Sequence, residues 1–311
     1  MIASRRFNDW LPVVLSMALL VSGCGIASSY RMAPQKTIRD FSDNGRYVKR
    51  VGVVALLNNA PFADDQAAVP FMSAFLESIQ AADSGAVLMI PGKTEEAAYL
   101  WNPPRLADGH LDVFALSRLA RQEGLNALVS PVLMDIRVLT RKTGFWIFRA
   151  VKYDLQVQTA ASLYDTITGS CLDLGILNQK IDIDAYDAER IRNGEEVVID
   201  ELFEVVQEMG EELGERMSKA IRESRWLASV VAVEEGGCII NAGSDAGIET
   251  GDRFSVLDGS EVLTGLDGER YVVPGLKLGE LVIERVTARQ SLGKPVSGQV
   301  PPAGSILIPG E

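Results

Sequence analysis

The sequence predicts an α/β (α+β) domain with a mixed sheet, followed by a small all-β barrel or sandwich. Three observations lead to this fold class. First, apolar runs suited to buried strands alternate with segments of helical periodicity up to about residue 225. Second, a hairpin pattern and a long amphipathic segment complete that region. Third, the chain beyond Trp226 holds short apolar runs between glycine-containing turns, with no segment long enough for more than one helical turn.

Each element of the first domain follows from its local pattern. Continuous or alternating apolar residues predict five strands, over residues 49–57, 86–90, 125–139, 150–164 and 171–183. Apolar residues at helical spacing predict three helices, over residues 71–81, 112–123 and 196–222. The DTITG run at residues 165–169 predicts the turn between the last two strands. In the longest helix the expected buried stripe is Val198, Leu202, Val205, Met209, Leu213, Met217 and Ala220.

The second domain is expected to consist of short strands, over residues 228–233, 238–241, 253–257, 277–286, 290–296 and 305–308. Gly243, Gly247 and Gly251 recur at a four-residue spacing and are followed by Asp252. We interpret these residues as a structural turn, because glycine permits positive φ and close approach of the backbone. The composition changes at Trp226, so the sequence predicts domains at residues 47–225 and 226–311 that fold separately.

The first 23 residues have the layout of a secretory signal peptide. Arg5 and Arg6 form a basic N-terminal region. An apolar stretch follows at residues 11–21 (LPVVLSMALLV), and it is too short to span a bilayer. Residues 21–24 (VSGC) resemble the bacterial lipobox. The resemblance implies cleavage between Gly23 and Cys24 and acylation of Cys24, palmitate included. An ordinary signal peptide with an incidental cysteine is the alternative.

The mature chain is expected to be anchored in the bacterial envelope. Two or more acyl chains on Cys24 would hold it stably at a membrane. Residue 25 is Gly25 and not aspartate, which by resemblance to enterobacterial sorting implies the outer membrane, facing the periplasm. Residues 24–46 are polar and lack periodicity, so we expect a tether between the anchor and the folded body.

Composition and charge exclude several kinds of function. The chain has 42 acidic and 30 basic residues and a formal net charge of −12, which disfavours nucleic acid as a partner. His110 is the one histidine, so HExxH zinc sites and centres with several histidines are excluded. The sequence predicts no cofactor, no metal site and no catalytic residues, and hence a protein that is not an enzyme.

Two motifs resemble ligand sites and depart from them. Residues 91–94 (PGKT) look like the end of a phosphate-binding Walker loop, but Val87 stands where that motif needs its first glycine. Four acidic residues between positions 182 and 189 suggest a calcium loop, but Asp187 would occupy the obligatory glycine of an EF-hand. We interpret the first as a turn that ends a strand and the second as a solvated acidic loop.

The densest aromatic cluster is the candidate interaction surface, formed by Phe145, Trp146, Ile147 and Phe148. Aromatic residues are enriched at protein interfaces, so the cluster suits a protein partner or a lipid surface. A core strand or the root of a β-hairpin is the alternative.

Two cysteines remain once Cys24 is acylated. Cys171 and Cys238 both lie in apolar strand contexts, where a free cysteine packs as a small hydrophobic residue. We favour free thiols over a disulfide between the two domains, because the Cα atoms would need to approach within about 7 Å.

Several runs resemble known envelope proteins. Residues 51–54 (VGVV), 116–135 (LSRLARQEGLNALVSPVLMD) and 163–169 (LYDTITG) resemble the periplasmic α/β domain shared by the curli secretion lipoprotein CsgG, the TolB N-terminal domain and flagellar assembly protein T. The C-terminal region resembles the C-terminal domain of flagellar assembly protein T. The runs that carry this second resemblance are residues 230–233, 240–243, 246–248, 251–254 and 279–283.

The resemblance implies a non-catalytic protein of envelope assembly or interaction, with an association with the flagellum as its most specific form. Its partners would be the membrane, through Cys24, and an unidentified envelope protein. Two alternatives stay open: a component of a CsgG-like outer-membrane secretion assembly, and an activator lipoprotein of peptidoglycan synthesis. A secretion pore needs membrane hairpins whose strands alternate apolar and polar residues. Only residues 136–159 have such a pattern, and basic side chains interrupt it.

Overall fold

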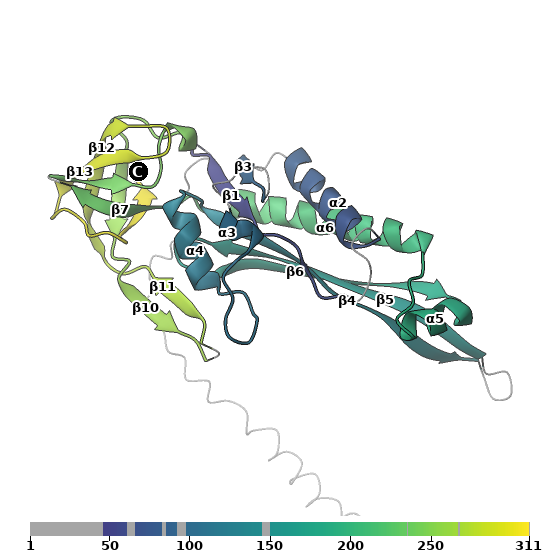
Figure 1. The fold of residues 1–311 in the computed structure, drawn as a ribbon. Helices are drawn as coiled ribbons and strands as arrows, with labels where there is room; N and C mark the ends of the chain where they lie inside the picture. Colours follow the sequence, from purple (N-terminus) through teal and green to yellow (C-terminus); the bar gives the residue numbers. More distant parts are fainter. Residues whose placement is uncertain are drawn as a thin grey trace, which may run out of the picture. The chain divides into compact units, whose positions relative to one another are not determined.

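The computed structural model describes residues 46–60, 66–82, 85–91, 98–144, 150–234, 236–266 and 268–310. Within these ranges the predicted fold class is confirmed. A mixed-sheet α/β domain is followed by a closed antiparallel barrel (Figure 1). Among the described residues, no helix combines the length and the apolar character needed to cross a membrane.

The sheet of the α/β domain has the strand order β3-β1-β4-β5-β6, with the short β2 paired to β4. Its strands are β1 (Lys49–Val53), β2 (Leu57–Asn58), β3 (Ala86–Met89), β4 (Ala127–Thr143), β5 (Ala150–Asp165) and β6 (Cys171–Ile183). Strand β1 runs parallel to β3 and β4, whereas β5 runs antiparallel to both of its neighbours, β4 and β6. The parallel part is therefore where helical crossovers are needed, and the antiparallel part is a simple meander.

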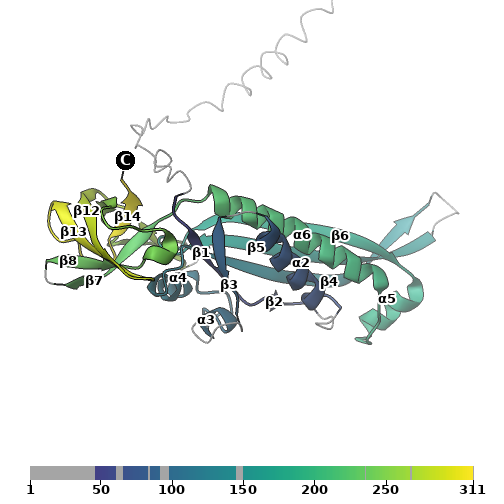
Figure 2. The same cartoon turned by 90° about the horizontal axis from the view of Figure 1, so that it is seen from above.

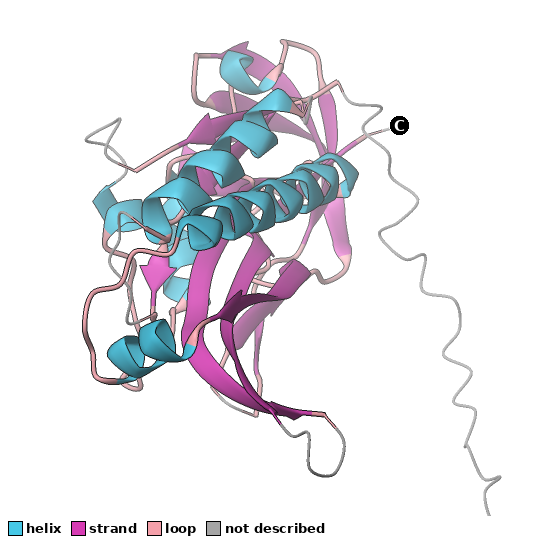
Figure 3. Cartoon of the chain, turned by 90° about the vertical axis from the view of Figure 1, so that its right-hand side faces the viewer, coloured by secondary structure: helices cyan, strands magenta, loops and turns pink. Residues whose placement is uncertain are grey.

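Two helices, α2 (Ala68–Ala81) and α6 (Asp200–Glu223), pack together along one face of the sheet (Figures 1 and 2). Figure 3 shows both helices lying across the strands. The core beneath them includes Phe71, Phe75, Leu155, Leu163 and Met209, all essentially inaccessible to solvent. On the opposite face, α3 (Ala98–Trp101) and α4 (Val113–Gln122) cover a second, smaller cluster around Leu116 and Leu128.

The buried residues predicted for the longest helix are confirmed along the centre of its buried face but not at the edges of that face. Leu202, Met209, Leu213 and Met217 are buried as expected. Val198 is 75% exposed, because the helix begins at Asp200 and not at Glu196. Val206 and Ile221 complete the stripe, and their neighbours Val205 and Ala220 are only partly buried. The sequence pattern therefore identified the buried face, but at two positions the fully buried residue is the one after the predicted residue.

The C-terminal domain is a barrel and not a sandwich, with strands in the closed order β12-β13-β8-β7-β14-β9. The strands are β7 (Ala228–Glu234), β8 (Gly237–Ile240), β9 (Arg253–Leu257), β12 (Lys277–Val286), β13 (Ser291–Ser297) and β14 (Ile306–Pro309). A single 3₁₀ turn, Ser244–Ala246, follows β8. A separate hairpin of β10 (Glu261–Thr264) and β11 (Arg270–Val273), which is not among the predicted strands, leaves the barrel between β9 and β12.

The first described residues belong to the barrel, although the sequence assigned Tyr47 to the α/β domain and Arg46 to the tether. Tyr47 lies in the barrel core with Trp226 and Phe254, and the Val48 amide donates to the Ala246 carbonyl. Lys49 then starts β1, and its ammonium donates to the carbonyl oxygens of Ile221 (2.8 Å) and Arg222 at the end of α6. The chain thus passes through the barrel core before it enters the sheet.

Candidate interaction surface

Two of the predicted sites lie outside the described residues. These are the lipidation and cleavage site at Gly23 and Cys24 and the aromatic cluster at Phe145, Trp146, Ile147 and Phe148. Strands β4 and β5 remain paired up to Thr143 and Ala150, on either side of the aromatic cluster. The PGKT run also falls mainly outside, since only its Pro91 is described, in a turn after β3.

The predicted glycine turn encloses Asp252. Gly247 and Gly251 have φ of +81° and +97°, and a Cβ at Gly243 would lie 2.2 Å from the Thr287 carbonyl oxygen. Asp252 accepts hydrogen bonds from the Glu249 amide (2.9 Å) and from the guanidinium of Arg46 (2.7 Å). The turn therefore ties the start of the described chain to the barrel, a role that local sequence patterns did not indicate.

The acidic segment at positions 182–189 is not the loop that the sequence predicted. Asp182 is the next-to-last residue of β6, and Asp184 is the N-cap of helix α5 (Ala185–Arg192), where it accepts from the Asp187 amide at 2.8 Å. Asp182 is also paired with Arg141 at 3.1 Å. These carboxylates therefore cap a helix and neutralise a basic side chain. No group of three or more potential metal ligands occurs among the described residues.

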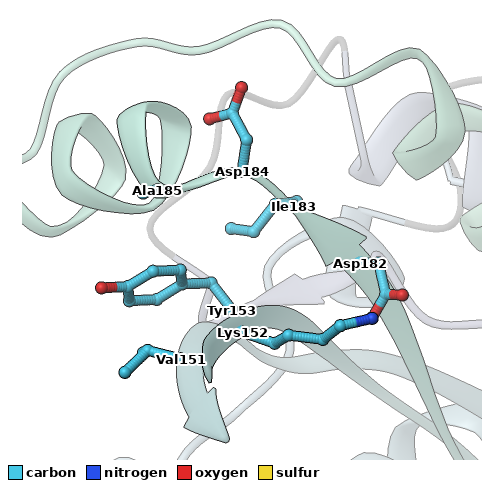
Figure 4. A pocket seen from close by; sticks show the side chains of 7 residues that line it. All are labelled: Val151, Lys152, Tyr153, Asp182, Ile183, Asp184 and Ala185. Carbon is cyan, nitrogen blue, oxygen red and sulfur yellow. The ribbon is translucent and has the colours of Figure 1, made fainter. Parts of the chain in front are cut away.

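A small hollow of about 210 Å³ lies where the start of β5 meets the end of β6 and α5 (Figure 4). Tyr153 and Ile183 line it, and Lys152 extends toward Asp182. The guanidinium of Arg192 lies 5.2 Å from the centre of the Tyr153 ring. Arg192 thus packs α5 against β5 at Tyr153, one of the residues that line the hollow.

A larger cavity, which we call the hairpin groove, has a volume of about 680 Å³. Residues 106–114 form one wall, Tyr164 and Cys171 form the floor, and residues 268–271 of the β10–β11 hairpin form the other wall. The groove contains His110 at its rim, together with Asp108, Asp112, Glu269 and Arg270. No sequence pattern indicates that these three segments lie together.

Specific contacts hold the hairpin against the α/β domain. The Val272 amide donates to the Thr168 carbonyl at 2.8 Å, and the Val272 side chain is buried against Ile167. Arg270 lies 4.4 Å above the ring of Phe114 and 3.6 Å from Asp112. The hairpin groove is therefore bounded by two fixed walls.

The ionisable groups of the groove have clear roles. Asp112 caps α4 by accepting from the Ala115 amide at 2.9 Å. Asp108 accepts from the His110 amide at 3.0 Å, and the imidazole Nδ1 is 3.5 Å from its other oxygen. Burial raises the pKa of the Tyr164 phenol, which keeps that ring a neutral part of the floor.

Next to the groove, strand β6 exposes apolar side chains. Gly175 abuts Leu213 of α6 and Asp173 binds Arg216 of the same helix, so these two positions face α6. The alternate positions, Leu174 and Ile176, point to the opposite face and are 48% and 57% exposed. They pair with the small residues Ser162 and Ala160 of β5, and we call these four residues the β6 face.

The two remaining cysteines are free thiols, as the sequence favoured, but only one is buried. Cys238 lies in the barrel core, and burial raises the pKa of its thiol to about 11. Cys171 is exposed at the floor of the hairpin groove, and its partial burial, assisted by Asp173, also raises the pKa of its thiol.

One signal for the groove was present in the sequence. The runs at residues 261–264 (EVLT) and 270–273 (RYVV) are β-rich and flank a turn that contains two glycines. That pattern is typical of a β-hairpin. The opposite wall, residues 106–114, carries no comparable signal, because its shape depends on turn hydrogen bonds such as that from the Leu106 amide to the His110 carbonyl (2.8 Å).

No protein-family model and no curated protein matches the chain. Solved structures are similar to part of this chain. Hypothetical protein CT253 from Chlamydia trachomatis is 10% identical, with 56% of this chain and 97% of that chain covered and a TM-score of 0.32. Lipoprotein GNA1162 from Neisseria meningitidis is 16% identical, with 47% and 93% covered and a TM-score of 0.26. TolB from Acinetobacter baumannii is 11% identical, with 79% and 57% covered and a TM-score of 0.25.

Proposed function

We propose that this chain is a lipid-anchored, periplasm-facing interaction protein of the bacterial cell envelope. The anchor is Cys24, at the outer membrane, and the polar segment after it is the tether. The folded body binds a protein partner through the β6 face, and its role is recognition and not catalysis.

The observation that carries this proposal is the exposure of Leu174 and Ile176 on the β6 face. Strand β6 is the last strand of the sheet, and α6 covers only its other side. Neighbouring exposed apolar side chains on a water-facing surface are typical of protein interaction sites. Ser162 and Ala160, which pair with them on β5, have small side chains, which suits a partner that lies flat on the sheet.

The most specific form of the proposal is an association with the flagellum. It is supported by the resemblance of the runs at residues 240–243, 246–248 and 251–254 to the C-terminal domain of flagellar assembly protein T. Those residues form the turn around Asp252 that binds Arg46. The tether therefore joins the body next to the region that carries this likeness.

Site-specific crosslinking in the cells that make this protein tests the proposal. The photoreactive residue p-benzoylphenylalanine replaces Ile176 in one variant and Glu212 in the control, because Glu212 is exposed on α6, on the other side of the sheet. We expect an adduct with one envelope protein at position 176 and none at position 212.

The identity of the crosslinked protein decides between the flagellar role and its two alternatives. A flagellar basal-body or assembly protein supports the flagellar role. A secretion component or a peptidoglycan synthase contradicts the flagellar role and supports the corresponding alternative. Absence of an adduct at position 176, or equal adducts at both positions, contradicts the proposal that the β6 face binds a partner.

A further inference from the structure

The hairpin groove has dimensions that suit a ligand. Its volume of about 680 Å³ lies within the range of roughly 300–1,000 Å³ that is typical of binding pockets. It is open on the side that faces solvent, where Asp108 and His110 are 60% and 83% exposed. A cavity of this size accommodates one or two side chains together with a short stretch of backbone.

The walls are fixed before any ligand arrives. Asp112 is held by its cap bond to α4, and Arg270 is held by Asp112 and by the ring of Phe114. On the hairpin side, Val272 is bonded to Thr168. Because little order is lost on binding to a preformed site, the groove favours affinity for an extended ligand.

The charge of the groove is negative. Asp108, Asp112 and Glu269 contribute three carboxylates, and Arg270 contributes one guanidinium that is already paired with Asp112. Asp108 has the His110 imidazole at 3.5 Å, and within the described residues neither Asp108 nor Glu269 is paired with a lysine or an arginine, so these two carboxylates are placed to attract a cation. The net charge of −12 of the whole chain adds to this field.

The aromatic residues of the groove suit a long basic side chain. Tyr164 forms part of the floor and Tyr271 part of the hairpin wall, and neither ring is covered by Arg270, which lies over Phe114. A lysine or arginine places its alkyl stem against such rings and its charge at a carboxylate.

The groove continues into the β6 face. Tyr164 lies two residues beyond Ser162 on β5, so both point to the same side of the sheet, and Ser162 pairs with Leu174. A peptide that leaves the groove along β6 therefore meets Leu174 and then Ile176.

We propose that the hairpin groove binds an extended segment of the partner protein that carries a lysine or an arginine. Its cation lies at Asp108 and Glu269, and apolar side chains that follow at alternate positions pack on Leu174 and Ile176. This inference rests on the proposed function, because it supplies the chemistry of the partner that the β6 face receives.

A phage-displayed library of random nonapeptides, selected against the full lipidated chain in detergent, tests the inference. We expect peptides with a lysine or arginine followed by alternating apolar residues to be enriched at least tenfold. The D108N/E269Q variant should lose most of the preference for basic residues. Glu261→Gln, an exposed carboxylate at the far end of the same hairpin, should retain it. All variants are compared only after their melting temperatures are shown to match that of the parent chain.

The outcomes separate this inference from the proposed function. Enrichment of acidic or uncharged peptides, no enrichment, or an unchanged basic preference in D108N/E269Q would overturn the inference. The adduct at position 176 would then still support the β6 face as an interface. Conversely, basic-peptide binding without any adduct at position 176 in cells would support the groove and overturn the proposed function.

Discussion

Tyr47 stacks on Trp226, with ring centroids 4.6 Å apart and an angle of 28° between the planes. Tyr47 lies just before β1, the first strand of the α/β domain, and Trp226 lies just before β7, the first strand of the barrel. Phe254 completes the cluster, at 5.9 Å from Tyr47 and 5.8 Å from Trp226. The barrel core is thus closed by a residue that precedes β1, so the N-terminal end of the described chain belongs to the C-terminal barrel.

Replacing Tyr47 with alanine should therefore destabilise the barrel. We expect a loss of about 3 kcal/mol in the free energy of unfolding, since the change removes a buried ring between two aromatic neighbours. The measurement is urea unfolding followed by tryptophan fluorescence, which reports on Trp226 among others.

Tyr47→Phe is the matched control for that variant. It keeps the ring and removes only the hydroxyl, which is 3.4 Å from Asp252, so it should cost no more than about 1 kcal/mol. If both variants lose equal stability, the hydroxyl and not the stacking holds Tyr47 in the barrel.

A second prediction concerns pH and the ion pair between β6 and α6. Arg216 donates two hydrogen bonds to Asp173, of 2.7 and 2.8 Å, and lowers the pKa of that carboxyl. Because the folded-state pKa is depressed, the contribution is present above the unfolded pKa of about 3.9 and is lost as the pH falls through the folded pKa.

Asp173→Asn should consequently lower the free energy of unfolding by about 0.5–1 kcal/mol at pH 7, the value typical of a partly exposed pair. The deficit relative to the parent should disappear toward pH 2, and urea midpoints measured between pH 2 and 7 will show it. Glu223→Gln, which removes a pair with a 4.0 Å separation, is the control and should change little. A deficit that is independent of pH contradicts the ionic explanation.

Strands could be predicted from the sequence where alternating apolar residues and flanking turn residues set their bounds. β9 and β12 begin and end where predicted, because each is an apolar alternation that ends at turn residues. Helix α5 could not be predicted in this way, since Ala188 is its one buried residue and no apolar stripe exists. That helix depends instead on the cap at Asp184.

The candidate site was less predictable than the fold. The hairpin groove joins residues 106–114, the β5–β6 turn and the β10–β11 hairpin, and their proximity follows from tertiary packing around Ile167 and Val272. The sequence predicted the strand that holds Leu174 and Ile176 but not their exposure, because an apolar strand position does not reveal whether a helix covers it. Tyr47 was assigned to the wrong neighbours for the same reason, since its partner Trp226 is remote in the chain.

The cysteines should differ in reactivity. Cys238 is fully buried with its thiol pKa raised to about 11, whereas Cys171 is exposed. Iodoacetamide at pH 8.5 should modify Cys171 in the folded chain and should reach Cys238 only in denaturant. Peptide mass spectrometry after each treatment gives the answer, and rapid labelling of Cys238 in the native protein would contradict its place in the barrel core.

Lipidation gives a direct test of the anchor. Cys24→Ser should abolish metabolic labelling with palmitate and leave an unprocessed precursor of higher mass, because serine lacks the sulfur that receives the lipid. Cys171→Ser, at an exposed free thiol, should label as the parent does. Labelling of the Cys24→Ser chain at the parental level would exclude this residue as the anchor.

The last prediction concerns the contact between α2 and α6. A Cβ at Gly210 would lie 2.5 Å from the Phe71 carbonyl oxygen, and one at Gly214 would lie 2.7 Å from that of Phe75. Alanine raises helix propensity by roughly 1 kcal/mol over glycine, but overpacking typically costs about 1–3 kcal/mol and backbone atoms cannot move aside alone. We therefore expect the G210A/G214A variant to lose about 2 kcal/mol in urea unfolding. Glu212→Ala, on the exposed side of the same helix, should change stability by no more than about 0.5 kcal/mol. A double variant as stable as the parent would mean that α2 and α6 can move apart without lowering the free energy of unfolding. The close packing of the two helices would then not be needed to hold them on the sheet.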